Sequence, residues 1–377
     1  MSVIKVLVIF GTRPEAIKMA PVISELSRRD GCEVKICFSG QHREMVEQVL
    51  SVFDLRPDFD LAVMKKDQSL ADVTTGVLSG VDGLLREYPA DMVLVQGDTT
   101  TVLAAALAAF YHRIPVGHVE AGLRTGDRFS PYPEEMNRLL ATRLSDLHFA
   151  PTEQAKRNLL RENVAGSAIR VTGNTVIDAL LCAERKLVTD RELLASLDEK
   201  FSFLDPDRKL ILVTGHRREN HGDGICSICA ALRTLAKRGD VELVYPVHPN
   251  PRVRDAVSRE LSGADGVHLI PPLDYLSFLY LMRRCVFIAS DSGGVQEEAP
   301  SLGKPVLVMR ETTERPEAVA AGTCRLVGTD PERIVAEAEA LLDDAAEYRR
   351  RSSIANPFGD GRAAIRIADA VEEYFAL

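Results

Sequence analysis

The chain has 377 residues, a length that suits two domains better than one hydrophobic core. Hydrophobic residues make up 46% and charged residues 27%, a composition typical of globular proteins. With 46 basic and 55 acidic residues, the formal net charge is −9, which argues against nucleic acid or an anionic membrane surface as a partner. An anionic ligand would need a local basic site.

The N-terminal apolar run Val3–Phe10 contains Lys5 and lacks a small-residue cleavage site, so we interpret it as a buried strand and not a signal peptide. No apolar stretch is long enough to span a membrane. The seven cysteines lack disulfide-like spacing, and the one close pair, Cys226 and Cys229, falls inside a predicted helix, Ile225–Lys237. No second pair completes a zinc site. These features predict a cytoplasmic protein without structural metal.

Short β-rich runs alternate with amphipathic stretches along the first half of the chain. The predicted strands are Val3–Phe10, Glu33–Phe38, Met92–Val95, Val116–Val119, Leu147–Ala150 and Ile169–Val171. The predicted helices between them include Pro14–Arg28, Leu70–Glu87, Thr99–His112 and Glu134–Leu144. This alternation is typical of a parallel sheet with helices on both faces.

The pattern breaks over the charged stretch Leu187–Arg208, and a second series of strands follows. These strands are predicted at Leu210–Thr214, Val241–Val247, Val267–Ile270, Val286–Ala289, Val306–Met309 and Arg325–Val327, before a last helix at Arg362–Phe375. The predicted fold is α/β, with two Rossmann-like, doubly wound parallel-sheet domains facing across a cleft. We place the first at 1–175, completed by 362–377, and the second at 176–361; ligands of such folds bind beyond the carboxyl ends of the strands.

The segment after the first strand has the features of an anion site at the start of a helix. Thr12 and Glu15 can form a capping box, and Pro14 suits the first turn. Arg13 and Lys18 would add two cations to the free N–H groups there. A well-capped turn without a ligand explains the same spacing.

A glycine-containing turn follows the strand Val286–Ala289, in the run Ser290–Glu298. Gly293 and Gly294 would let the backbone approach a phosphate closely, and the Glu298 carboxylate could accept hydrogen bonds from ribose hydroxyls. A flexible turn that opens a helix is the alternative. No G-x-G-x-x-G run follows any strand, which argues against a nicotinamide cofactor.

Three carboxylates are predicted near one edge of the first sheet. Asp98 and Glu120 follow neighbouring strands, and Glu134 begins a helix close by. Asp98 could instead cap the next helix, and Glu134 could be an ordinary first-turn acid. Acids that converge on one edge repel each other, which suits acid–base chemistry.

In the second half, polar side chains again follow the predicted strands. His216 and Arg217 come after Leu210–Thr214, and His248 comes after Val241–Val247. Arg315 lies beyond Val306–Met309. These residues are candidates for the same ligand edge, although a histidine in such a loop can be purely structural.

Eleven segments of the chain together resemble the non-hydrolysing UDP-N-acetylglucosamine 2-epimerase family. They are GTRPEAIKMAP, QHREM, GDTTT, GHVEAGLRTGD, PEEMNR, TGNTVIDAL, TGHRREN, YPVHPNP, SDSGGVQEEAPSLGKPVLVMR, TTERPEAV and NPFGDG. They extend over nearly the whole chain. The departures are small: Gln96 stands where the family more usually has His, and Glu44 and Asp67 stand where some members have Gln and Arg.

The resemblance implies a glycosyltransferase-B fold, a cytoplasmic homodimer and no cofactor. The implied UDP contacts are Arg13, Phe278, Ser292, Gly293, Gly294, Glu298 and Arg315. The implied catalytic residues are Lys18, Asp98, Glu120, Glu134 and His216. A second UDP-N-acetylglucosamine, acting as an allosteric activator, would contact Gln41, Arg43, Gln68, Glu135, Arg217 and His248.

The implied reaction inverts C2 of UDP-N-acetylglucosamine to give UDP-N-acetylmannosamine, which supplies bacterial surface polysaccharides. Because C2 has no adjacent carbonyl, we expect anti elimination of UDP to 2-acetamidoglucal and then syn re-addition, with Asp98 and Glu134 as the acid–base groups. A glycosyltransferase, a hydrolysing epimerase and a non-catalytic UDP-sugar sensor are the alternatives. A sensor would have no use for the three carboxylates.

Overall fold

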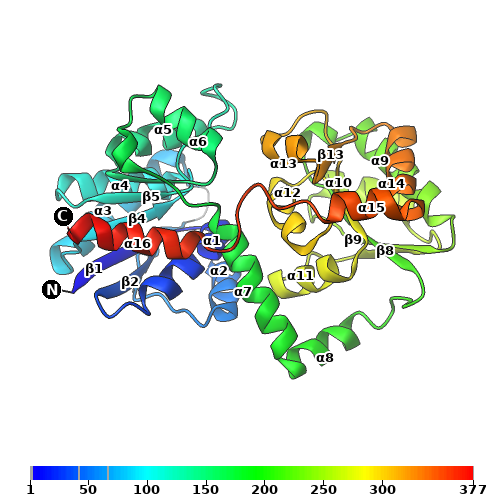
Figure 1. The fold of residues 1–377 in the computed structure, drawn as a ribbon, viewed down its shortest axis with the longest axis horizontal. Helices are drawn as coiled ribbons and strands as arrows, with labels where there is room; N and C mark the ends of the chain where they lie inside the picture. Colours follow the sequence, from blue (N-terminus) through cyan, green and yellow to red (C-terminus); the bar gives the residue numbers. More distant parts are fainter. Residues whose placement is uncertain (1–2, 41–42, 66–67, 377) are drawn as a thin grey trace. The chain divides into compact units, whose positions relative to one another are not determined.

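The computed structural model describes residues 3–40, 43–65 and 68–376, and within these it leaves out the side chains of residues 43–45 and 218. The chain divides into two compact units. The first contains Met1–Ala183 and Phe358–Leu377, and the second contains Glu184–Pro357. Each unit is built on one parallel sheet (Figure 1). The prediction of two parallel-sheet α/β domains is therefore confirmed.

The first unit contains a seven-stranded sheet in the order β3-β2-β1-β4-β5-β6-β7, with every pairing parallel. Its strands are β1 Ile4–Phe10, β2 Cys32–Phe38, β3 Phe59–Asp60, β4 Met92–Gln96, β5 Val116–Val119, β6 Leu147–Ala150 and β7 Ile169–Val171. The chain order reverses between β1 and β4. In doubly wound sheets, ligands bind beyond the carboxyl ends of the strands at such a reversal.

Helices cover both faces of this sheet (Figure 1). The helices of this unit are α1 Arg13–Leu26, α2 Arg43–Val52, α3 Leu70–Glu87, α4 Thr100–Tyr111, α5 Glu134–Leu144, α6 Glu153–Arg161 and the C-terminal α16 Ala363–Ala376. The helix α7 Thr175–Thr189 begins in the first unit and ends in the second. The terminal helix α16 packs on α1. Arg29, just beyond α1, holds it with ion pairs to Asp369 at 2.7 Å and Glu372 at 2.6 Å.

The second unit repeats this topology with six parallel strands in the order β10-β9-β8-β11-β12-β13. The strands are β8 Lys209–Thr214, β9 Val241–Pro246, β10 Val267–Ile270, β11 Phe287–Ser290, β12 Val306–Val308 and β13 Cys324–Leu326. The reversal now lies between β8 and β11. The helices are α8 Arg191–Lys200, α9 Asp223–Ala236, α10 Pro251–Leu261, α11 Tyr275–Arg284, α12 Gly293–Glu298, α13 Pro316–Ala321, α14 Pro331–Asp343 and α15 Ala345–Ser352.

The central strands carry apolar side chains on both faces of the sheet. Val6 to Phe10 of β1 are all fully buried, as expected for a central parallel strand covered on both faces. The two-residue β3 is too short to show a sequence pattern. The helix α8 lies inside Leu187–Arg208, where the sequence predicts a break, because a helix with few buried residues carries little periodic signal.

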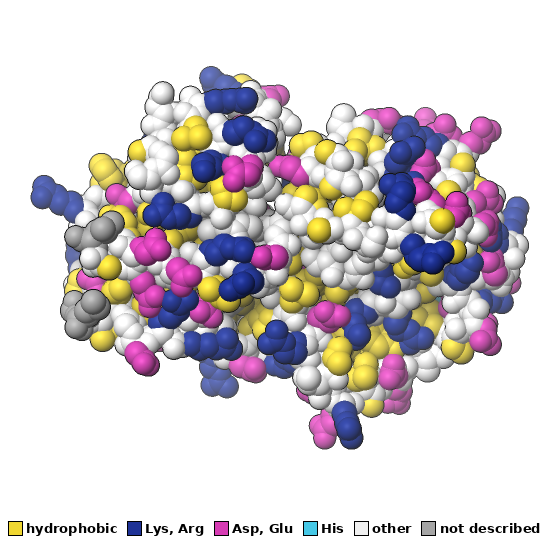
Figure 2. Space-filling view, viewed as in Figure 1, with side chains coloured by type: hydrophobic (Ala, Val, Ile, Leu, Met, Phe, Trp, Pro, Cys, Tyr) yellow, Lys and Arg dark blue, Asp and Glu magenta, His cyan; other side chains and the backbone are white. Residues whose placement is uncertain are grey.

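On the surface seen in Figure 2, Lys and Arg side chains are interspersed with Asp and Glu over both units. Neither sign gathers into one large field there. Among the described residues, the helices are too short or too polar for any of them to cross a bilayer.

Candidate functional site

The turn after β1 is organised by one buried carboxylate, that of Glu15, which is 2% exposed. It accepts hydrogen bonds from the N–H groups of Gly11 at 2.9 Å and Thr12 at 2.7 Å, and from the Thr99 hydroxyl at 2.6 Å. The predicted capping box is therefore formed. Burial raises the pKa of Glu15. Because Thr99 follows β4, this one side chain connects the two strand ends that flank the reversal.

The two cations predicted at this turn have different surroundings. The guanidinium of Arg13 makes no ion pair or side-chain hydrogen bond with any residue that the structure describes. The Lys18 ammonium, in contrast, lies 2.5 Å from Glu120 Oε1, and both side chains are largely buried. Lys18 is thus committed to a carboxylate, and Arg13 is the cation left open to an external anion.

Glu120, directly after β5, is held on both carboxylate oxygens. Oε1 also accepts from the Asn174 amide at 3.1 Å, and Oε2 accepts from the Gln96 amide. Its backbone adopts a left-handed conformation, with φ of 65°. A residue with a Cβ seldom adopts this conformation unless its surroundings enforce it, and such strain is concentrated at functional sites.

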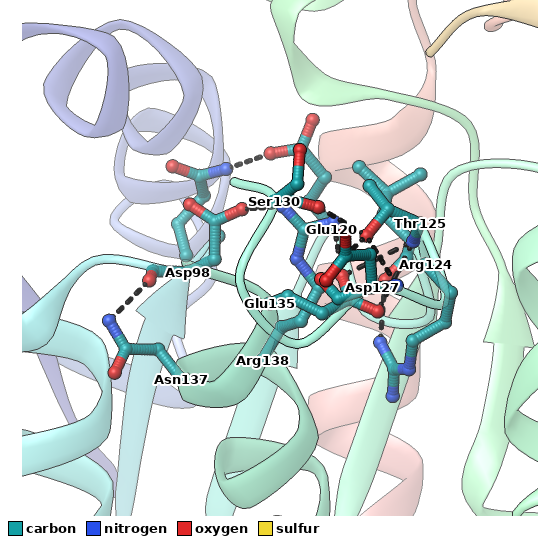
Figure 3. A network of polar contacts seen from close by, with 12 residues as sticks. Asp98, Glu120, Arg124, Thr125, Asp127, Ser130, Glu135, Asn137 and Arg138 are labelled. Carbon is teal, nitrogen blue, oxygen red and sulfur yellow. Dashed lines mark hydrogen bonds and ion pairs between the residues drawn. The ribbon is translucent and has the colours of Figure 1, made fainter. Parts of the chain in front are cut away.

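Asp98 lies at the carboxyl end of β4, and its side chain is free of a capping role. The N-cap of α4 is Thr99, whose hydroxyl accepts from Val102 N at 3.4 Å. The Asp98 carboxylate instead accepts a hydrogen bond from Arg138, and its backbone carbonyl accepts one from Asn137 at 2.9 Å. Figure 3 shows both partners rising from α5 toward Asp98.

Glu134 begins α5, one turn before Arg138 on the same helix. Its Oε2 atom is buried and has no hydrogen-bond partner among the described residues. A buried polar atom without a partner is costly and calls for an explanation, of which an absent ligand is one. Asp98 and Glu134 therefore have opposite surroundings within the described residues, because Asp98 is ion-paired with Arg138 whereas Glu134 Oε2 lacks a partner.

In the second unit, Asp291 organises the turn after β8. It is 1% exposed, and its Oδ2 accepts from the N–H groups of His216 at 2.9 Å and Arg217 at 2.8 Å. The His216 ring lies with Nδ1 3.4 Å from Asp291 Oδ1 and stacks on His248, with ring centroids 5.5 Å apart. Burial lowers the pKa of His216 despite the nearby Asp291. Of the residues predicted on this edge, His216, Arg217 and His248 therefore lie together at this turn.

The glycine turn after β11 lies against a cation. A Cβ built on Gly293 would come within 3.2 Å of Arg315 Cζ, so the guanidinium lies directly against the glycine backbone. Arg315 Nε donates to Glu297 Oε1 at 2.8 Å, which orients its side chain. Ser292 is the N-cap of α12, and its side chain makes no capping hydrogen bond. A phosphate at this turn would meet backbone N–H groups and a guanidinium together.

The remaining predicted residues are spread over both units. In the second, Glu298 is 9% exposed with the Tyr275 hydroxyl 3.4 Å away, and Phe278 is half-buried on α11. In the first, the Gln68 amide bonds to the nearby backbone: Nε2 donates to Val63 O, and Oε1 accepts from Lys65 N, both at 2.7 Å. Glu135, 2% exposed, accepts from Thr125 and Gly126 N–H groups. Gln41 and the Arg43 side chain lie outside the described residues, which contain no cluster of His, Cys, Asp or Glu that could hold a metal ion.

Sequence reasoning missed the residues that hold the candidates in place, namely Arg138, Asn174 and Asp291. Two signals were available: Asn174 and Asp291 both follow strand ends, and Arg138 lies three positions after Glu135 on a helix, where side chains meet. The side chains and backbone groups that these three residues contact, however, cannot be predicted from their spacing in the sequence.

Comparison with known proteins places these features in a family. Residues 24–372 match the family model described as UDP-N-acetylglucosamine 2-epimerase. A UDP-N-acetylglucosamine 2-epimerase of Escherichia coli is 56% identical over 98% of both chains. A probable UDP-N-acetylglucosamine 2-epimerase of Ralstonia nicotianae is 55% identical over 99% of this chain and 100% of its own length.

Solved structures agree with this assignment. The crystal structure of UDP-GlcNAc 2-epimerase from Neisseria meningitidis bound to UDP-GlcNAc matches with a TM-score of 0.91 and 50% identity, covering 98% of this chain and 100% of that one. The enzyme from Methanocaldococcus jannaschii in complex with UDP-GlcNAc and UDP matches with a TM-score of 0.81 and 34% identity, again covering 98% and 100%. The chain therefore belongs to the UDP-N-acetylglucosamine 2-epimerase family.

Proposed function

We propose that this enzyme interconverts UDP-N-acetylglucosamine and UDP-N-acetylmannosamine by inverting C2 of the sugar. The observation that carries the proposal is a contrast between two carboxyl groups of the first unit. Asp98 accepts a hydrogen bond from Arg138, whereas Glu134 Oε2 is buried with no hydrogen-bond partner among the described residues. Inversion of a C–H centre needs one group to remove a proton and another to deliver one on the opposite face. Relatives solved with UDP-GlcNAc support the choice of substrate.

The proposed reaction begins with loss of the C2 proton to one of these carboxylates. The C1–O bond breaks, and its electron pair leaves with UDP while a double bond forms between C1 and C2 of 2-acetamidoglucal. In the second step a UDP oxygen re-adds to C1, and C2 takes a proton from the other face. The Glu120 carboxylate would stabilise positive charge that develops at C1 and the ring oxygen.

UDP must be retained while the glucal exists, and we assign this to residues of the second unit. Arg315 against Gly293, with His216, would bind the diphosphate in the second unit. Lys18 would act mainly through its ion pair with Glu120, because its ammonium is already engaged there.

One experiment separates this proposal from its rivals. The purified protein is incubated with UDP-GlcNAc alone in deuterium oxide and followed by NMR. The proposal predicts accumulation of UDP-ManNAc with deuterium at C2. Release of UDP and free N-acetylmannosamine would indicate a hydrolysing enzyme, and an unchanged substrate would favour a glycosyltransferase that needs an acceptor.

Carboxamide variants test the two acid–base residues directly. We expect Asp98→Asn and Glu134→Gln each to lower kcat by about 10²–10⁴-fold, with UDP affinity changed far less. Glu153→Gln, on the exposed first turn of α6, is the matched control and should retain wild-type turnover. Normal turnover in either test variant would remove that residue from the mechanism.

A further inference from the structure

The side chain of Arg138 is placed between two carboxylates. Nη2 donates to Asp98 Oδ2, and Nη1 lies 3.2 Å from Glu135 Oε2. The Arg138 side chain is 11% exposed, and its Nε is buried without a partner among the described residues. An arginine that served only to neutralise one acid would present two N–H groups to it. Here the two terminal nitrogens of the guanidinium contact different carboxylates, so Arg138 connects the two acids.

The two ends of this connection differ in what holds them. The backbone of Asp98 is already held by Asn137, whose side-chain amide donates a hydrogen bond to the Asp98 carbonyl at 2.9 Å. Arg138 is thus left to determine the direction of the Asp98 side chain, which is 29% exposed and contacts solvent on its other side. In Figure 3 the side chains of Asp98, Glu135 and Arg138 are turned toward one another.

At the other end, Glu135 holds the loop that leads into α5. Its carboxylate accepts from Thr125 N at 3.2 Å and Gly126 N at 3.1 Å. The loop closes on itself through the Thr125 hydroxyl, which donates to Ser130 O at 2.5 Å. A continuous polar chain therefore runs from this loop through Glu135 and Arg138 to Asp98.

We propose that Arg138 is a positioning residue, which holds the Asp98 carboxylate in its reacting orientation and makes that orientation depend on the loop of residues 125–130. This inference rests on the proposed function, because it concerns Asp98 as an acid–base group. Misplacing such a group by about 1 Å can cost roughly 10²-fold in rate. The arginine acts through Asp98 and has no chemical step of its own.

The first test is Arg138→Met in the full-length enzyme, measured with UDP-GlcNAc. We expect kcat to fall about 10–100-fold, while KM and the affinity for UDP change less than about threefold. Arg143→Met removes the same charge from an exposed position in the last turn of α5, and it should behave as wild type. Arg138→Lys should regain part of the lost kcat, since an ammonium can still reach one carboxylate.

The second test is a double-mutant cycle with Asp98→Asn. If Arg138 acts through Asp98, Arg138→Met should lower kcat of the Asp98→Asn enzyme less than about threefold, because the contact it supports is already lost. Losses that multiply in the double variant would overturn the proposal and indicate a general structural role, as would wild-type kcat in Arg138→Met. UDP binding and the thermal midpoint confirm that the variants are folded.

The outcomes distinguish this inference from the proposed function. A wild-type enzyme that produces no UDP-ManNAc would overturn the function on which the inference rests. A wild-type enzyme that is active, with Arg138→Met equally active, would overturn the inference alone. If Arg138→Met does not fold, Arg138→Lys takes its place in the cycle, with the same expectations at smaller amplitude.

Discussion

Lys18 and Glu120 are separated by 102 positions in the chain, yet the ammonium of one lies 2.5 Å from the carboxylate of the other. Lys18 comes from α1, which follows β1, and Glu120 comes directly after β5. The pair therefore joins segments from both sides of the strand reversal. Gln96 and Asn174 complete the shell around Glu120, so this carboxylate is held more firmly than any single contact would allow.

Breaking this pair should reduce both stability and turnover. Lys18→Met leaves a largely buried carboxylate without its cation, which we expect to lower the free energy of unfolding by about 3 kcal/mol. Adding Glu120→Gln should restore most of that stability but no turnover, because the charge proposed to stabilise the transition state is gone. Urea unfolding and the NMR assay measure the two effects. Restored turnover in the double variant would contradict the assigned role.

The contact between Gly293 and Arg315 should make UDP binding sensitive to a single methyl group. In Gly293→Ala the new Cβ would meet the guanidinium at 3.2 Å and displace it. Losing one charge-assisted hydrogen bond to phosphate should weaken UDP binding about tenfold, as measured by isothermal titration calorimetry.

Gly294→Ala is the comparison for this experiment. A Cβ there would meet only Ser292 Oγ, at 4.0 Å, and would leave Arg315 in place. Its effect on UDP affinity should be smaller than that of Gly293→Ala. An equal effect would mean that bulk at the turn, and not the position of Arg315, controls binding.

Two buried histidines should make the first unit sensitive to acid. Burial lowers the pKa of both His118 and His148 from 6.5 to about 4. Between these values the unfolded chain binds protons that the folded chain does not, so stability is present above about pH 6.5 and is lost as the pH falls toward 4. Each histidine can contribute up to about 3 kcal/mol to this loss.

Urea unfolding of the wild type and of His148→Gln at several pH values between 7 and 4 measures this contribution. The variant should lose less stability than the wild type over that interval, because one of the two protonation sites is gone. Parallel curves for the two proteins would contradict the assignment to His148.

Where the helices and strands lie was largely determined by local sequence. Alternating apolar runs placed Val116–Val119, Leu147–Ala150 and Val267–Ile270 at their observed bounds. Because carboxyl ends of parallel strands meet at one edge of a sheet, the polar residues that follow them could be assigned to that edge. The local pattern is weak at the two-residue β3 and at the mostly exposed α8, and neither element was predicted.

The sequence by itself thus determined which residue types stand at the strand ends, and with them the candidate chemistry of Asp98, Glu120 and Glu134. Only the tertiary structure decided their partners. Arg138 reaches Asp98 over 40 positions, and Arg315 lies against Gly293. Such pairings depend on how separate βα units pack, and periodicity within one segment carries no information about that packing.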